Sequence, residues 1–143
     1  MKRVWGMTLL VGTGVGLFLT PQLAHAQACK DEVSMIDGSK QALVELTETV
    51  KKESLPDFER SNQQKSAVNK LSIHTSMLGE LVSCLDKAAQ DTTASKADVE
   101  AAKAQRDASA KLLEKIQHQQ SGIKDAKDSK DAKDRIEKLD LTT

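Results

Sequence analysis

The chain has 143 residues with 21 basic and 21 acidic side chains, and only 2% of its residues are aromatic. This balance of charge argues against a nucleic-acid partner, because neutralising phosphates needs an excess of basic residues. With so few aromatic rings, a site that stacks on bases, sugars or a flat cofactor is not expected either.

The first 26 residues have the three regions of a secretory signal peptide. Two basic residues open the chain, an apolar run covers 4–19, and small residues follow at Ala24 and Ala26. A membrane-spanning helix usually needs about 20 apolar residues, so the run indicates a cleaved signal and not a retained anchor. We expect cleavage after Ala26 or Ala28 and export to a bacterial periplasm or the extracellular space.

Contact with the membrane is expected only through this signal or through a lipid on Cys29. Cleavage after Ala28 would leave Cys29 at the amino terminus, where bacterial lipoproteins carry their lipid. Ala26 stands where such signals prefer leucine, so lipid attachment is the weaker alternative.

Two amphipathic helices are predicted after the signal, one over 31–53 and a second that follows the break at 54–57 and runs to about Ala88. Apolar residues recur in both at every third or fourth position, and Phe58 stands at the start of the second stripe. Between them, Ser54 is predicted to cap the second helix and Pro56 to lie in its first turn. The stripes consist of Val33, Ile36, Leu43, Leu46 and Val50, and of Ala67, Leu71, Leu78, Leu81 and Leu85.

The two cysteines of the exported part, Cys29 and Cys84, are predicted to form a disulfide. They stand at similar distances on either side of the break near Leu55, so an antiparallel hairpin brings them to the same open end. An even pair of cysteines in an oxidising compartment is most simply bonded. Two free thiols are the alternative.

A third helix is predicted over about 96–120. Ser95 and Asp98 resemble a capping box, and Gly122 is a plausible terminator. The stripe of this helix has polar residues in its middle, where a self-sufficient bundle would have apolar ones. We therefore expect this helix to present a partner-binding surface, formed by Arg106, Ser109, Leu113 and Ile116.

The last segment, 123–143, is rich in Lys-Asp repeats and is predicted to be a disordered spacer or a frayed helix. Its period-four pairs Lys124–Asp128, Lys127–Asp131 and Lys130–Asp134 place the lysine first, which is the less favourable order for a helix. We expect residues beyond about 122 to be dispensable for folding. The apolar residues near its end, Ile136, Leu139 and Leu141, are expected to be solvated or to dock on a partner.

No catalytic or metal-binding motif is recognised, so the expected chemistry is that of a contact surface. His74 lies on the apolar stripe of the second helix with no ligand-type residue three or four positions away. His118 lies near the end of the third helix, where it can interact with terminal carbonyl groups. We expect neither an enzyme nor a metal site.

The sequence thus predicts an all-α protein with a signal peptide (1–26), a disulfide-stapled antiparallel helical hairpin (27–90), a third helix (91–122) and a charged tail (123–143). The expected function is protein–protein contact in the cell envelope, with another envelope protein or by self-association. Two alternatives stay open: a periplasmic helical chaperone or inhibitor that binds apolar segments, and a metal- or small-ligand-binding protein that uses His74 or His118.

Overall fold

The computed structural model of the chain describes residues 29–52 and 54–143. These residues form four α-helices, with no strand among them: α1 (Lys30–Lys52), α2 (Asp57–Ala89), α3 (Lys96–Lys124) and α4 (Ser129–Glu137). The predicted all-α class is therefore confirmed. The predicted signal peptide lies outside the described residues.

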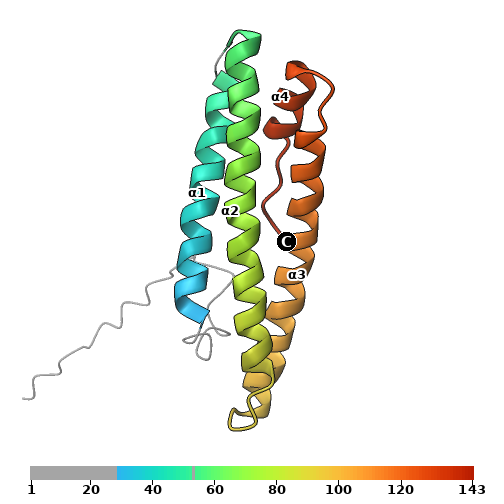
Figure 1. The fold of residues 1–143 in the computed structure, drawn as a ribbon. Coiled ribbons are helices and arrows are strands. Elements are labelled where there is room, and N and C mark those ends of the chain that lie inside the picture. The colour runs from blue at the N-terminus through green and yellow to red at the C-terminus, as the bar shows by residue number, and fades with distance from the viewer. Residues whose placement is uncertain (1–28, 53) are drawn as a thin grey trace, which may run out of the picture.

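The three long helices lie side by side as an elongated bundle (Figure 1). α2 runs antiparallel to α1, and α3 runs antiparallel to α2. α4 is short and lies at the end of the bundle where α1 leads into α2, and the last residues run back along the bundle. All four helices therefore surround a common core.

Cys29 and Cys84 are joined by a disulfide, with their Cα atoms 5.9 Å apart, as the spacing predicted. The bond ties the start of α1 to the last part of α2. Cys29 is fully buried and packs with Leu81 and Leu85 in a small apolar cluster. Because the bond links residues 55 positions apart, the chain-entropy model assigns it a stabilisation of about 4 kcal/mol.

The turn before α2 is organised differently from the prediction. Pro56, and not Ser54, occupies the N-cap position, and no side chain caps the helix there. The turn is instead closed by Arg60, whose Nε donates to the carbonyl oxygen of Leu55 at 2.9 Å. Pro56 thus precedes the first turn, in which it was predicted to lie, and its ring fixes φ near the observed −58°.

α3 begins as predicted and ends later than predicted. The Ser95 hydroxyl accepts a hydrogen bond from the backbone N–H of Asp98 at 3.2 Å, which confirms the predicted cap. The helix then passes through Gly122 and ends at Lys124. Ile123 is fully buried, and its carbonyl oxygen accepts a hydrogen bond from Gln64 Nε2 at 2.8 Å. Burial of this side chain favours the additional turn over termination at the glycine.

The segment after α3 is folded and packed, which corrects the expectation of a solvated or frayed tail. α4 contacts each of the other three helices, and Ala132 and Ile136 are buried in it. Leu141, beyond the helix, is 9% exposed. The apolar residues of this segment are few, but they are spaced so that they meet the core from one side. The segment therefore belongs to the folded unit and is not expected to be dispensable.

Local hydrogen bonds explain why this Lys-Asp-rich segment can form a helix. The Asp128 side chain caps α4 by accepting from the backbone N–H of Asp131 at 2.8 Å. Asp131 in turn pairs with Arg135 at 2.8 Å, four residues later. The carboxylate comes first in this pair, which is the favourable order against the helix dipole. The Asp131–Arg135 pair was not among the period-four pairs named in the sequence analysis, all of which place lysine first.

The main core cluster draws on α1, α2, α3, α4 and the last residues of the chain. α1 contributes two fully buried side chains, so α2 and α3 need a further apolar surface to complete their burial. The segment after Gly122 supplies that surface. The buried members are Leu43, Val50, Ala67, Leu71, Leu78, Ile116, Ile123, Ile136 and Leu141.

Replacement of Ile136 tests whether α4 is part of the folded unit. Ile136 is 1% exposed, so Ile136→Ala is expected to lower the free energy of unfolding by about 2–5 kcal/mol. The measurement is urea denaturation followed by circular dichroism. Asp134→Ala is the control, because Asp134 is exposed on the same helix. A loss for Ile136→Ala no greater than that of the control would mean that α4 does not stabilise the bundle.

Candidate functional site

The four residues predicted to form a contact surface on α3 differ in their surroundings. Ile116 is fully buried in the main core cluster. Leu113 is half-buried and packs against the same cluster, and Ser109 is partly exposed. This face of α3 is thus largely occupied by the rest of the chain, and Ile116 has no surface to offer a partner.

Arg106 is paired within the chain. Its Nη1 lies 2.9 Å from Asp86 Oδ1 on α2, and its Nη2 lies 3.0 Å from Asp107 Oδ1 on α3. The hydrogen bonds that it donates, first to Asp86 and then to Asp107, raise the pKa of Arg106, so the guanidinium stays charged. Asp86 of α2 therefore supplies a carboxylate for Arg106, and this pair joins α2 to α3 without a partner protein.

His74 is the buried polar residue among the described part of the chain, with 1% of its surface exposed. It lies in α2, and its Nδ1 is 2.5 Å from the Ser39 hydroxyl oxygen on α1. That hydroxyl donates its single hydrogen to the carbonyl oxygen of Ile36 at 3.0 Å. With the hydroxyl hydrogen directed to Ile36, we assign the ring proton to Nδ1, which donates it to Ser39 and leaves Nε2 unprotonated.

The other ring nitrogen of His74 has no hydrogen-bond partner, although it is buried. Burial first, and the positive charge of Lys40 second, lower the pKa of His74 below its ordinary value of 6.5. Ser39 and His74 do not form a nucleophile–base pair, because the hydroxyl hydrogen points to Ile36 and no group orients Nε2. The remaining chemistry of this ring is the uptake of a proton at Nε2, in an apolar environment that opposes the charge.

No metal site is found in the part of the chain that the structure describes. No three His, Cys, Asp or Glu side chains there are grouped so that they could hold a metal ion. His118, the other described histidine, is exposed on α3. Among the same residues, no helix is both long enough and apolar enough to cross a membrane.

Phe58 is the most exposed large apolar side chain among the described residues, at 77%. The sequence interpretation placed it on the buried stripe of α2, and this was wrong. Phe58 stands thirteen residues before Leu71, which turns it about 140° away from that stripe. Helical periodicity counted over the whole of α2 would therefore have identified it as outward-facing.

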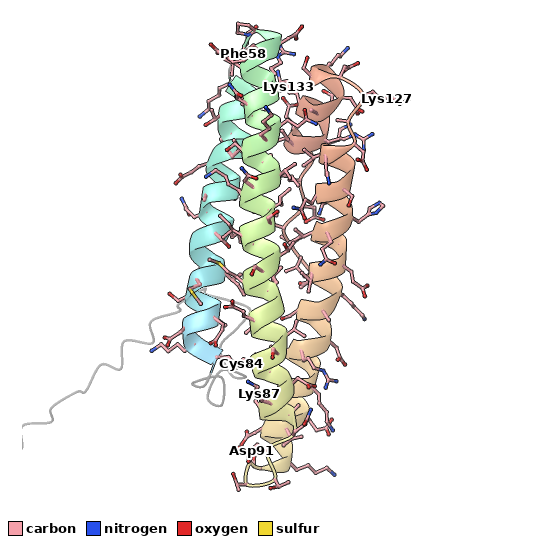
Figure 2. The ribbon with its side chains drawn as sticks, viewed as in Figure 1. Phe58, Cys84, Lys87, Asp91, Lys127 and Lys133 are labelled. Carbon is pink, nitrogen blue, oxygen red and sulfur yellow. A yellow bond between two sulfur atoms is a disulfide. The ribbon has the colours of Figure 1, made fainter. Side chains whose placement is uncertain are left out.

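The end of the bundle that carries Phe58 is held by contacts between helices. Figure 2 shows Phe58 at one end and Asp91 at the opposite end. Next to Phe58, Asp57 Oδ1 accepts a hydrogen bond from the Ser129 hydroxyl of α4 at 2.8 Å. Arg60, one turn later, closes the preceding turn through Leu55. Phe58 is thus presented from an ordered part of the molecule.

The surface grooves found among the described residues are open to solvent. One, of about 420 Å³, lies between α2 and the end of α3 and is lined by Lys65, Val68 and Lys124, among others. Another, of about 330 Å³, lies between α1 and the last residues of the chain and includes Val44 and Leu139. Neither encloses a ligand in the way that small-molecule sites do.

Comparisons with protein-family models, with curated proteins and with solved structures found no match for this chain.

The pairing of Arg106 with Asp86 can be tested by salt dependence. Asp86→Asn keeps the size of the side chain and removes the charge that joins α3 to α2, so a small loss of stability is expected at low salt. The loss relative to the unaltered chain should shrink near 1 M NaCl, where the screening length falls to about 3 Å. Asp107→Asn is the control, because it removes a charge pair within α3. An equal loss in both variants, or no effect of salt, would contradict the role of Asp86.

Proposed function

We propose that this chain is exported and acts outside the cytoplasm by binding another protein, with Phe58 as the central contact residue. The single observation that carries the proposal is the exposure of this aromatic side chain, 77%, at an ordered end of the bundle.

Export is supported by two independent features. The first 26 residues have the basic, apolar and small-residue regions of a secretory signal. The Cys29–Cys84 disulfide suits an oxidising compartment, because such bonds are kept reduced in most cytosols.

The energetics of a contact at Phe58 are favourable. Removing a phenylalanine side chain from water contributes roughly 1.5–3 kcal/mol, and aromatic residues are enriched in the centres of protein interfaces. The hydrogen bonds of Asp57 to Ser129 and of Arg60 to Leu55 order the surrounding turn before binding. Less conformational entropy is then lost on association than for a flexible loop.

The neighbours of Phe58 indicate the kind of partner that fits. Asp57 and Glu59 flank it directly in the sequence, and both are exposed. A partner with an apolar pocket and a basic rim would bury the ring and complement these carboxylates. A protein partner is favoured over a small ligand, because the exposed ring stands at the end of the bundle (Figure 2) and lines neither of the grooves described above.

Replacement of Phe58 tests this function. Phe58→Ala is expected to leave the melting temperature within the range of the unaltered chain, because the side chain is mostly exposed, and to reduce binding of the partner at least tenfold. Ile73→Ala is the control, because Ile73 is also apolar and 53% exposed. The partner is first identified by placing a photo-reactive phenylalanine analogue at position 58, with position 92 at the other end of the bundle as the matched site.

Three outcomes would overturn the proposal: no adduct specific to position 58, equal loss of binding in Phe58→Ala and Ile73→Ala, or an adduct with twice the mass of the chain. The last result would show that a second copy, and not a different protein, covers Phe58.

Export has its own test. Cells that express all 143 residues should release the chain from the periplasm or into the medium in a form shortened by 26 or 28 residues, with no free thiol. Mass spectrometry of the non-reduced protein measures both properties. A full-length chain retained in the cytoplasm, or two thiols open to alkylation, would contradict export.

A further inference from the structure

The contact between His74 and Ser39 joins the middle of α1 to the middle of α2. The two ends of α1 are tied in other ways, by the disulfide at Cys29 and by the short turn that leads into α2. Between these ties, the hydrogen bond of His74 Nδ1 to Ser39 is a polar link in an otherwise apolar seam. The imidazole is a titratable group of this seam; on α1, three residues after Cys29, the Glu32 carboxylate also has a buried oxygen without a hydrogen-bond partner.

A second proton on the ring would have no acceptor. Nε2 is buried and has no hydrogen-bond partner. Leu71 and Leu78, one turn before and one turn after His74, are both buried in the main core cluster. Placing a charge among such groups is costly unless it is paired or reaches water. Protonation therefore requires that water or another acceptor gain access to Nε2.

The charged groups around the ring oppose protonation or are engaged elsewhere. From α1, Lys40 acts on the ring and repels a second positive charge. On α2 itself, Lys70 lies one turn before His74. From α3, Gln120 is neutral and donates to Val68 and Ser72. From α3 and the last residues, Lys115 and Asp140 pair with each other.

α1 is the element that can give way. Its buried residues are only Leu43 and Val50. Gly38 lies in the middle of this helix, directly before Ser39, and a Cβ there would meet nothing within 4 Å. Glycine inside a helix costs about 1 kcal/mol relative to alanine. Besides the seam that contains His74, the middle of α1 is held by the buried Leu43 and by Ile36 and Leu46, which are only partly buried against the main core.

We propose that His74 is a proton-sensitive lock: when its Nε2 takes up a proton, the middle of α1 separates from α2 and the imidazolium becomes hydrated. The disulfide and the turn keep both ends of α1 in place, so the separation is local and reversible. It exposes the apolar stripe of α2, including Leu71 and Leu78. This inference does not depend on the partner proposed for Phe58.

The direction of the pH effect follows from proton linkage. The closed form holds the pKa of His74 below 6.5, whereas an open form exposes the ring and restores its ordinary value. Opening therefore takes up a proton and is favoured as the pH falls below about 6.5. Until the pH reaches the pKa of the closed form, the opening equilibrium should rise by up to about tenfold per pH unit.

Hydrogen exchange measured by mass spectrometry tests the lock on the exported chain with its disulfide intact. Exchange is followed between about pH 7.5 and 5 and corrected for the intrinsic rate of each amide. The carboxylates of Asp131 and Asp140 remain ionised in this range, because hydrogen bonds hold the pKa of each below its usual value. The amides of α1 around Ser39 should lose protection about tenfold per pH unit below 6.5, and those of α3 should change much less.

Two variants and a control decide the outcome. His74→Asn can keep a hydrogen bond to Ser39 and cannot titrate, so its α1 amides should show no pH dependence. If the asparagine variant does not fold, His74→Leu replaces it: leucine is apolar and cannot titrate, so exchange of the α1 amides should again not depend on pH. His118→Gln removes the exposed histidine of α3 and should behave like the unaltered chain.

The proposal is overturned if the unaltered chain shows no acid-dependent exchange in α1, or if the dependence persists in the His74 variants. It is also overturned if α3 loses protection in step with α1, because this would indicate unfolding of the whole bundle.

Discussion

Burial of a small shared core is the constraint on which the rest of this structure depends. α1 has two fully buried side chains and α4 has two, so neither helix has enough apolar surface to be stable by itself. The long helices α2 and α3 contribute most of the residues of the main core cluster but do not cover it on one side. Closing that side requires Ile123, Ile136 and Leu141 as well as Leu43 and Val50. The charged segment after α3 is consequently structural.

The disulfide and the polar links between helices act within the frame set by that core. The Cys29–Cys84 bond joins the start of α1 to α2 and lowers the entropy of the unfolded chain. Asp86 and Arg106 join α2 to α3 at the far end, and Ser129 and Asp57 join α4 to α2 near Phe58. These links fix the relative positions of the helices. His74 differs from them, because one of its nitrogens is left unsatisfied inside the seam.

Several features followed from the sequence because they depend on short stretches of chain. The three long helices lie close to the predicted ranges, and Ser95 caps α3 as its spacing from Asp98 indicated. The disulfide followed from the similar distances of the two cysteines from a turn, because antiparallel helices bring such positions to the same end. His74 was recognised as lying on the apolar stripe, but its hydrogen bond to Ser39 joins residues 35 positions apart and left no local signal.

The features that were missed depend on which surfaces meet. Ile136 and Leu141 are isolated among lysines and aspartates, so their local composition resembles that of a solvated segment; only the open side of the α2–α3 stripe makes their burial favourable. Arg106 was predicted to belong to a partner-binding surface, but it pairs with Asp86 of α2 in the folded chain. The sequence by itself determined the three long helices, one cap and the pairing of the cysteines, because these depend on periodicity and spacing along the chain. The tertiary structure alone decided which side chains are buried and which, like Phe58, stay exposed, because burial depends on the helix that packs opposite.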